Sequence, residues 1–473
     1  MSLRERVLRG GIYLVLRQGL SVGIGLGGVL LLTRFLGPTN YGLYAGTLAI
    51  VMFLYNTATL GIDVYLVRRE GPQGDSVYHQ AFSFLLLSGI AVSAAGILVS
   101  PLLGRWLGDS GFLAPLQIML LSVPITVLYV PARARLERAL DFRKIAGIEL
   151  AGQLLLYAVS LPLAWRGYGV WAPVAGYFVW QVWMLASGFF LARYRPRWWW
   201  SEKLLREMLG YSVGYWTSTR IWAFRRLVNP LIVGHFLGPQ GVGYVALAVR
   251  IVEVLSFVKD ASWRLSIVAL AKVQGELPRL RRGLEEAMGL QSLALGPLLA
   301  GFAVVAPWLL PLAFGNDWLP VLKVYPFIAL GYFVNAVFSM HSSVLYVLQR
   351  NAEVLIFNAV HVALFAGAAL LFVPWLGLQG YGLAEVAALG SYVVVHIFVA
   401  RLFTFSYERS WPWLLAFVPP LFVPLVGLPW GLGLCVCTVV AALSGTARSQ
   451  VSEYWKYLGR IRKSKEESFQ GSP

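Results

Sequence analysis

Charged residues recur within one apolar stretch of this chain, between Arg250 and Arg264. The stretch also contains Glu253 and Asp260, so charges stand at its first, fourth, eleventh and fifteenth positions. This spacing places all of them on one face of a helix. An ionised group at membrane depth costs about 2.5–3.5 kcal/mol on insertion scales. The charges therefore either form two ion pairs within the stretch, or they face water or a polar ligand.

The composition is that of an integral membrane protein. Of the 473 residues, 58% are hydrophobic and only 13% are Asp, Glu, Lys or Arg, whereas a soluble domain averages about 25% charged residues. The apolar runs are long enough for helices rather than barrel strands, so we predict an all-α, polytopic fold. The formal net charge of +17 does not indicate nucleic-acid binding, because most basic residues lie in loops between apolar runs.

Fourteen apolar runs are predicted to span the membrane. They cover residues 11–33, 42–67, 79–101, 112–131, 146–165, 170–192, 211–234, 242–268, 287–311, 324–348, 354–373, 380–402, 411–427 and 429–445. Orientation follows from the enrichment of Lys and Arg in cytoplasmic loops. With a cytoplasmic N-terminus, the outer loops contain only Arg34, Arg105, Arg166 and Lys323. Both termini are then cytoplasmic.

The sequence contains an internal repeat. R-F-L-G-P-T-N-Y-G at 34–42 recurs as H-F-L-G-P-Q-G-V-G at 235–243, and G-Y-G at 167–169 recurs at 380–382. Each copy contains six predicted spans, so both copies insert with the same orientation, related by an axis along the membrane normal. The predicted domains are an N-lobe (1–192), a cytoplasmic interfacial linker (193–210), a C-lobe (211–405), two extra transmembrane helices (406–447) and a cytoplasmic tail (448–473).

The linker is unusually rich in arginine and tryptophan. Its residues 193–207 read R-Y-R-P-R-W-W-W-S-E-K-L-L-R-E. Both residue types suit the headgroup region of a bilayer, so we predict an amphipathic helix lying in the membrane plane.

Polar residues recur at equivalent places in the two copies, which predicts a central cavity between two lobes. The candidate substrate-binding residues are Arg17, Arg220, Arg225, Arg226, Arg250 and Arg264. The candidate coupling or gating residues are Asp63, Glu253 and Asp260. The excess of cations favours an anionic ligand, and the rigid guanidinium fork suits the oxygens of a diphosphate. A structural ion pair is the alternative for each arginine. Arg225 and Arg226 are adjacent and cannot both face the same way.

No metal site and no cofactor are predicted. His341, His361 and His396 lie in late spans without a ligand spacing and are expected to be packed polar residues, as is Glu385. The chain has no glycine-rich phosphate loop with a lysine, which argues against ATP hydrolysis. It also shows no nucleophile–base pair in an outer loop, which argues against a membrane-bound enzyme.

The motifs R-F-L-G-P-T-N-Y-G-L-Y and, after it, G-I-D-V-Y-L-V-R-R resemble those of polysaccharide flippases (O-antigen and exopolysaccharide) of the multidrug/oligosaccharidyl-lipid/polysaccharide exporter superfamily. The resemblance covers residues 1–405, and the second copy of the motif departs from it at His235 and Val242. It implies a MATE-like fold of two pseudo-symmetric six-helix bundles, here with two extra C-terminal helices. It also implies alternating access and transfer of undecaprenyl-diphosphate-linked oligosaccharide to the outer leaflet of the bacterial inner membrane.

The expected partners are this lipid-linked oligosaccharide, membrane lipids, a polysaccharide polymerase, glycosyltransferases and a coupling H⁺ or Na⁺, with no nucleic acid. Two other functions stay open. One is a cation-coupled multidrug exporter of the same superfamily, which would need an acidic, aromatic cavity. The other is a non-transporting scaffold of a polysaccharide assembly complex.

Overall fold

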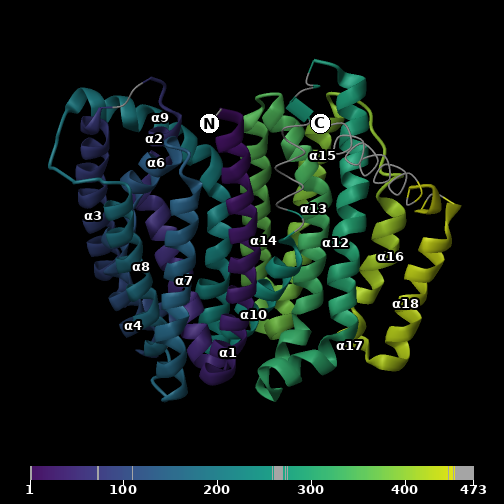
Figure 1. Ribbon diagram of the computed structural model, residues 1–473. Helices are drawn as coiled ribbons and strands as arrows, with labels where there is room; N and C mark the ends of the chain where they lie inside the picture. The colour runs from purple at the N-terminus through teal and green to yellow at the C-terminus, as the bar shows by residue number, and fades with distance from the viewer. Residues whose placement is uncertain are drawn as a thin grey trace, which may run out of the picture. The chain divides into compact units, whose positions relative to one another are not determined.

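The computed structural model describes residues 3–452 except 72–73, 109, 258, 260–269, 272, 274, 446 and 451, with side chains described outside 3–18, 22, 110, 213–220, 428 and 442. The described part is built from helices, as predicted (Figure 1). In chain order the elements are α1 (Leu3–Thr59), α2 (Ile62–Arg68), α3 (Asp75–Leu107), α4 (Ser110–Leu120), α5 (Ser122–Leu128), α6 (Val130–Arg138), α7 (Phe142–Trp165), α8 (Trp171–Leu191), α9 (Glu202–Phe224), η1 (Arg225–Leu227), η2 (Asn229–Val233), α10 (Gly234–Leu255), α12 (Leu277–Phe314), η3 (Asn316–Lys323), α13 (Tyr325–Val347), α14 (Asn351–Ala388), α15 (Ser391–Ala400), α16 (Trp411–Leu421), α17 (Val423–Val426) and α18 (Leu428–Leu443).

The chain forms two compact units. Unit 1 consists of Met1–Leu247, Leu310–Val321 and Phe365–Ala384, and unit 2 consists of the intervening and C-terminal segments. This division follows packing, whereas the predicted lobes follow the sequence repeat. The lobe boundaries therefore remain a prediction.

The helices are long and apolar enough for a multi-pass membrane protein. Among the described residues, nine helical stretches meet the length and hydropathy of a membrane span, and two shorter apolar helices follow near the C-terminus. The 57 residues of α1 would extend about 85 Å at 1.5 Å per residue, far beyond the hydrocarbon core of about 30 Å. Gly37, whose backbone angles are not helical, divides α1 into two helices at a kink. Fourteen spans remains a prediction.

Each unit has its own apolar core. In unit 1, fully buried side chains from α3, α4, α7 and α8 meet, among them Leu85, Leu116, Ile148 and Tyr177. In unit 2, α12, α13 and α15 contribute Met288, Met340, Val344 and Val395. Since lipid is as apolar as these side chains, close packing rather than exclusion from water holds such helices together.

The linker is not helical along its whole length, so the predicted interfacial helix over 193–207 is wrong for part of it. Residues 194–201 have no regular secondary structure. Helix α9 begins only at Glu202, where Ser201 caps the helix by accepting a hydrogen bond from the backbone N–H of Leu204. Pro196 lacks a backbone N–H, and bulky aromatic residues lose side-chain freedom in a helix, which together disfavour helix before Ser201. From Glu202, α9 runs across the end of unit 1 at which α1 begins (Figure 1).

Candidate functional site

Two equivalent glycines bend the two copies of the repeat in the same way. Gly37 in α1 has φ 68° and ψ 173°, and Gly238 in α10 has φ 65° and ψ −172°. This region of backbone conformation is essentially restricted to glycine. The shared geometry supports the repeat predicted at 34–42 and 235–243. The second repeated motif differs, since Gly167 and Gly169 have positive φ values whereas 380–382 lie within α14.

The two copies also touch each other within unit 1. A Cβ atom added to Gly42 would lie 1.8 Å from the carbonyl oxygen of Pro239, and one added to Gly243 would lie 2.2 Å from that of Pro38. The two glycines are equivalent in the repeat, so the contact is reciprocal. Small residues let membrane helices approach this closely. We call the contact between 38–42 and 239–243 the glycine crossing.

Aromatic side chains pack around the glycine crossing. The buried Trp318 of η3 is approached edge-on by the rings of Tyr41 and Tyr244, with centroid distances of 5.7 and 6.1 Å. His235 stacks on Trp106 at 4.0 Å.

Helix geometry changes where the predicted arginine pair lies. Helix α9 ends at Phe224, a 3-10 turn covers Arg225–Leu227 (η1), and a π-helical turn covers Asn229–Val233 (η2). Pro230 has no N–H, so the regular hydrogen-bond ladder cannot pass through it. Such turns inside helices frequently mark functional sites. The sequence predicted one regular span over 211–234, and Pro230 was the only signal of the irregularity.

The two adjacent arginines have different surroundings. The guanidinium carbon of Arg225 lies 5.0 Å from the ring centroid of Phe365 and 5.7 Å from that of Trp222, and the side chain is half-buried. Arg226 is exposed and makes no ion pair or hydrogen bond within the described part of the chain. Arg225 is therefore held by aromatic rings, whereas Arg226 is exposed and unpaired among the described residues.

Three further candidates are described. Arg250 and Glu253 form an ion pair at 3.7 Å, with side chains 41% and 39% exposed. Of the two ion pairs that the sequence allows between Arg250 and Arg264, the one between Arg250 and Glu253 is therefore formed. It leaves both charged groups accessible to solvent or a ligand. Asp63 lies in the first turn of α2, and its buried Oδ1 accepts no hydrogen bond from the described residues.

The other candidates cannot be placed. Asp260 and Arg264 lie outside the described residues, as do the side chains of Arg17 and Arg220. One turn after Arg17, Ser21 donates a hydrogen bond to Oε1 of Gln153 in α7 at 2.6 Å. That side chain is satisfied inside unit 1.

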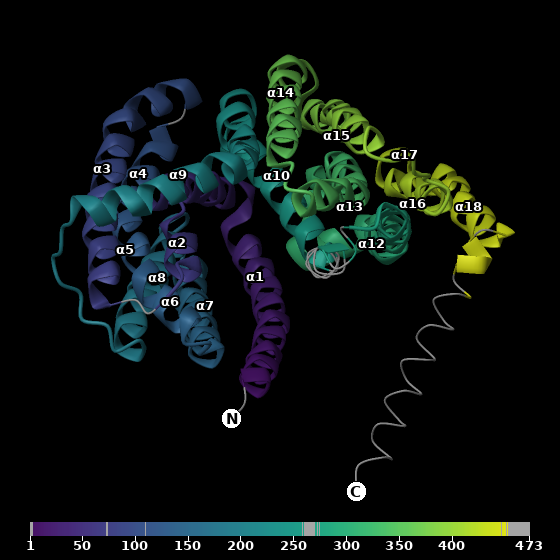
Figure 2. The ribbon, with the colours of Figure 1, turned by 90° about the horizontal axis from the view of Figure 1, so that it is seen from above.

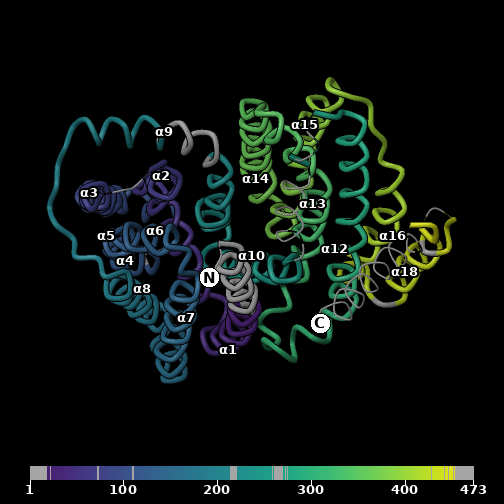
Figure 3. The backbone as a smooth tube through the Cα atoms, turned by 45° about the horizontal axis from the view of Figure 1, so that its top comes forward, coloured from purple at the N-terminus to yellow at the C-terminus, as the bar shows by residue number. Residues whose placement is uncertain are grey.

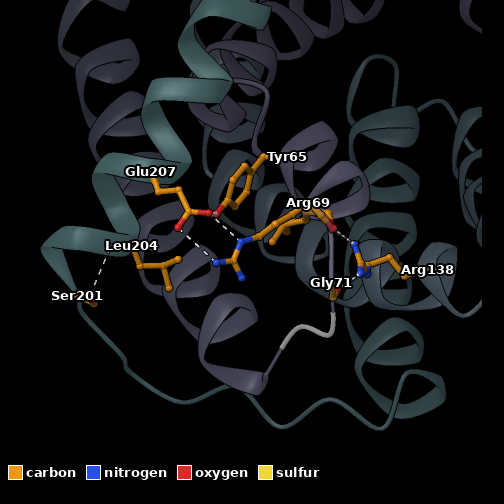
Figure 4. A network of polar contacts seen from close by, with 8 residues as sticks. Tyr65, Arg69, Gly71, Arg138, Ser201, Leu204 and Glu207 are labelled. Atoms are coloured by element: carbon orange, nitrogen blue, oxygen red, sulfur yellow. Dashed lines mark hydrogen bonds and ion pairs between the residues drawn. The ribbon is translucent and has the colours of Figure 1, made fainter.

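A polar network ties α9 to α2 (Figure 4). Glu207 accepts hydrogen bonds from the hydroxyl of Tyr65 at 2.8 Å and from Nε of Arg69 at 2.9 Å. Arg138 of α6 donates to backbone carbonyls after α2, including those of Arg69 and Gly71, which satisfies acceptors at the helix end. The bonded Arg69 guanidinium holds the pKa of Glu207 below its usual range.

Replacing Glu207 by Gln is expected to lower the free energy of unfolding by about 1 kcal/mol or less, because the carboxylate is 47% exposed and exposed pairs contribute little. The folded pKa lies below the unfolded value of 4.5. The stabilisation is therefore complete above that value and is lost as the pH falls through the lowered folded pKa. Thermal unfolding of the detergent-solubilised protein at a series of decreasing pH values measures this loss of stability.

The matched control is Glu202→Gln, one turn earlier on α9. Glu202 pairs with Arg206 at 3.7 Å, with both side chains about four-fifths exposed. We expect this variant to unfold as the unmodified protein does. Identical pH dependence of the Glu207→Gln variant and the unmodified protein would contradict the role given to Glu207.

The late histidines are packed polar residues, as predicted. His341 Nε2 and His396 Nδ1 lie 3.0 and 2.8 Å from the hydroxyl of Tyr407, and His361 Nδ1 lies 2.9 Å from Oγ of Ser391. Glu385 is buried as well. Within the described ranges, no three His, Cys, Asp or Glu side chains gather to hold a metal ion.

The fold is that of a class of membrane transporters. The chain is similar to the lipid II flippase MurJ in an inward closed conformation, with a TM-score of 0.71 and 16% identity over 94% of this chain and 99% of that one. It is also similar to an inward-facing multidrug resistance MATE family transporter of the MOP superfamily, with a TM-score of 0.64 and 15% identity over 82% and 98% of the two chains. The predicted MATE-like fold is confirmed.

The chain belongs to the polysaccharide biosynthesis protein family, whose model matches residues 31–323. It is 24% identical to the succinoglycan biosynthesis transport protein ExoT of Rhizobium meliloti (strain 1021), over 69% of this chain and 66% of ExoT. It is 26% identical to the lipopolysaccharide biosynthesis protein WzxC of Escherichia coli (strain K12), over 68% and 67% of the two chains. The chain thus spans about two thirds of these relatives. The family confirms the resemblance that the motif at 34–42 indicated.

Proposed function

We propose that this protein is a flippase that moves a lipid-linked oligosaccharide across the membrane by alternating access. One observation carries the proposal within this family: Arg226 is accessible and has no partner in the described part of the chain, at an irregular turn inside an apolar helix. A cation at membrane depth is retained where it faces water or a polar ligand. The names of ExoT and MurJ, a transport protein and a flippase, support the same class of activity.

The substrate proposed is undecaprenyl-diphosphate-linked oligosaccharide. A diphosphate presents several acceptor oxygens, and a guanidinium group donates to two of them in one plane. Arg226 takes this role, and Arg225 orients the turn through its contacts with Phe365 and Trp222. The polyprenyl tail stays in the lipid, which is as apolar as the tail, so the tail adds no solvation penalty to transport. The other substrate-binding residues of the proposal are Arg17, Arg220, Arg250 and Arg264.

The proposal places both termini in the cytoplasm of a bacterium and the spans in its inner membrane, as the distribution of Lys and Arg favours. Asp63, Glu253 and Asp260 are the groups proposed to couple transport to H⁺ or Na⁺. The buried Oδ1 of Asp63, which accepts no hydrogen bond from the described residues, supports this role, because such an oxygen gains most from a proton or a cation. A polysaccharide polymerase and glycosyltransferases are the proposed protein partners.

The test is transport in proteoliposomes that contain the purified protein and a fluorescent polyprenyl-diphosphate-linked sugar. We expect the label to become accessible to a membrane-impermeant quencher much faster than in protein-free liposomes. Failure to move the lipid, together with uptake of an organic cation, would instead indicate a multidrug exporter. If the protein moves neither the lipid-linked sugar nor the organic cation, but cells still need it to assemble polysaccharide, the result would indicate a scaffold.

A further inference from the structure

The segment Tyr194–Ser201, here called the strap, has no regular secondary structure and is held against α3. The backbone N–H of Trp199 donates to Oγ of Ser83 at 3.0 Å, and that of Ser201 donates to Oε1 of Gln80 at 2.7 Å. At the other end, the buried hydroxyl of Tyr194 donates to a backbone carbonyl of α3 at 3.0 Å. The strap therefore has a defined position despite lacking regular secondary structure.

The strap lies on the periphery of unit 1. Seen from above, the chain between α8 and α9 runs around the outer edge of the unit, outside α3 (Figure 2). The tube in Figure 3 shows the same course. Because α3 is long and apolar enough to cross a membrane, we expect the outside of this edge to face lipid rather than the interior of the protein.

The contacts with α3 also give the depth of the strap. Helix α3 has 33 residues, so it is about 50 Å long and extends about 10 Å beyond the hydrocarbon core at each end if centred. Gln80 and Ser83 lie about 7 to 12 Å from the start of the helix at Asp75. The strap is thus at the level where headgroups meet hydrocarbon.

Large and basic side chains are left uncovered on the strap. Trp198 is 59% exposed and stacks on Trp200, with ring centroids 6.2 Å apart and planes at 11°. Arg195 and Arg197 are both exposed and stand two residues apart in the chain. Neither arginine forms an ion pair with a residue that the structure describes, and the strap contains no acidic residue.

We propose that the strap is a binding site for the headgroup of an anionic phospholipid. Arg195 and Arg197 contact the lipid phosphate, and the stacked tryptophans lie at the boundary that indole rings favour. The ligand is anionic because the strap offers two cations without a counter-charge at headgroup depth. The occupant is a lipid rather than a protein because the site faces the bilayer. This site is separate from Arg226 and does not depend on the proposed transport function.

The test is native mass spectrometry of the full chain in detergent, titrated with phosphatidylglycerol and, separately, with phosphatidylcholine. Each basic residue near an anionic surface contributes about 1 kcal/mol, or roughly a fivefold change in affinity. We expect the double change Arg195→Gln with Arg197→Gln to weaken phosphatidylglycerol binding about 25-fold and to leave phosphatidylcholine binding unchanged. Replacing Trp198 and Trp200 by Ala should weaken the binding of both lipids.

The matched control replaces two other exposed arginines, Arg105 and Arg166, by Gln. This variant carries the same change in net charge and should keep its affinity for phosphatidylglycerol within about twofold. Equal loss in both double variants would show a general charge effect and overturn the proposal. The variant with Arg195→Gln and Arg197→Gln could also keep its lipid affinity but lose a protein that co-purifies with the unmodified chain. That result would overturn the lipid proposal in favour of a protein partner.

Discussion

Alanine at Gly243 is expected to reduce transport at least tenfold and to destabilise unit 1 by about 3 kcal/mol or more. The added Cβ would lie 2.2 Å from the carbonyl oxygen of Pro38 and 3.3 Å from the backbone nitrogen of Gly42. Both atoms belong to the backbone, so no side chain can rotate to relieve the overlap. The two helices would have to separate at the glycine crossing.

Alanine at Gly42 should have the same effect, because its Cβ would lie 1.8 Å from the carbonyl oxygen of Pro239. The double variant should be less than additive, since one separation of the helices relieves both overlaps. Thermal unfolding of the solubilised protein and transport in proteoliposomes measure the two effects separately.

Gly27 provides the matched control in the same helix. A Cβ there would meet nothing within 4 Å, and alanine is favoured over glycine in a helix by up to about 1 kcal/mol. We expect Gly27→Ala to be neutral or slightly stabilising and to transport normally. Unchanged stability and transport in Gly243→Ala would mean that the glycine crossing is not the close contact seen in the structure.

Replacing Arg226 by Gln is expected to lower the transport rate of a diphosphate-linked lipid by about 10- to 100-fold. A charge-assisted hydrogen bond contributes about 1.5–3 kcal/mol, which corresponds to this range. Arg226→Lys should restore part of the rate, because lysine keeps the charge but loses the planar, two-pronged donor geometry. The assay follows a labelled lipid-linked sugar at several substrate concentrations.

Arg225 is the internal comparison for this prediction. Because its guanidinium contacts Phe365 and Trp222, Arg225→Gln should lower thermal stability as well as transport, whereas Arg226→Gln should leave stability unchanged. Arg105→Gln, at an exposed position in the last turn of α3, serves as the charge control. Normal transport by Arg226→Gln would remove that arginine from the proposed substrate site.

Several features of this protein follow from sequence alone. Long apolar runs force helices, because only intrasegment hydrogen bonds satisfy the backbone in lipid. The motif at 34–42 and its copy at 235–243 revealed the repeat, since a turn of this kind needs glycine followed by proline at fixed places. Local chemistry is sufficient for both conclusions.

Other features depended on which helices pack together. The sequence showed Gly42 and Gly243 as equivalent, but only the folded chain brought them into contact. It offered Arg225 and Arg226 as alternatives, and the ring of Phe365, 140 residues away, distinguished them. The sequence does not pair Arg69 with Glu207, 138 residues later, and only the folded chain places the two side chains 2.9 Å apart. Spacing along a helix predicts which residues share a face. Which helix packs against that face depends on contacts between distant parts of the chain, and a local sequence pattern does not predict those contacts.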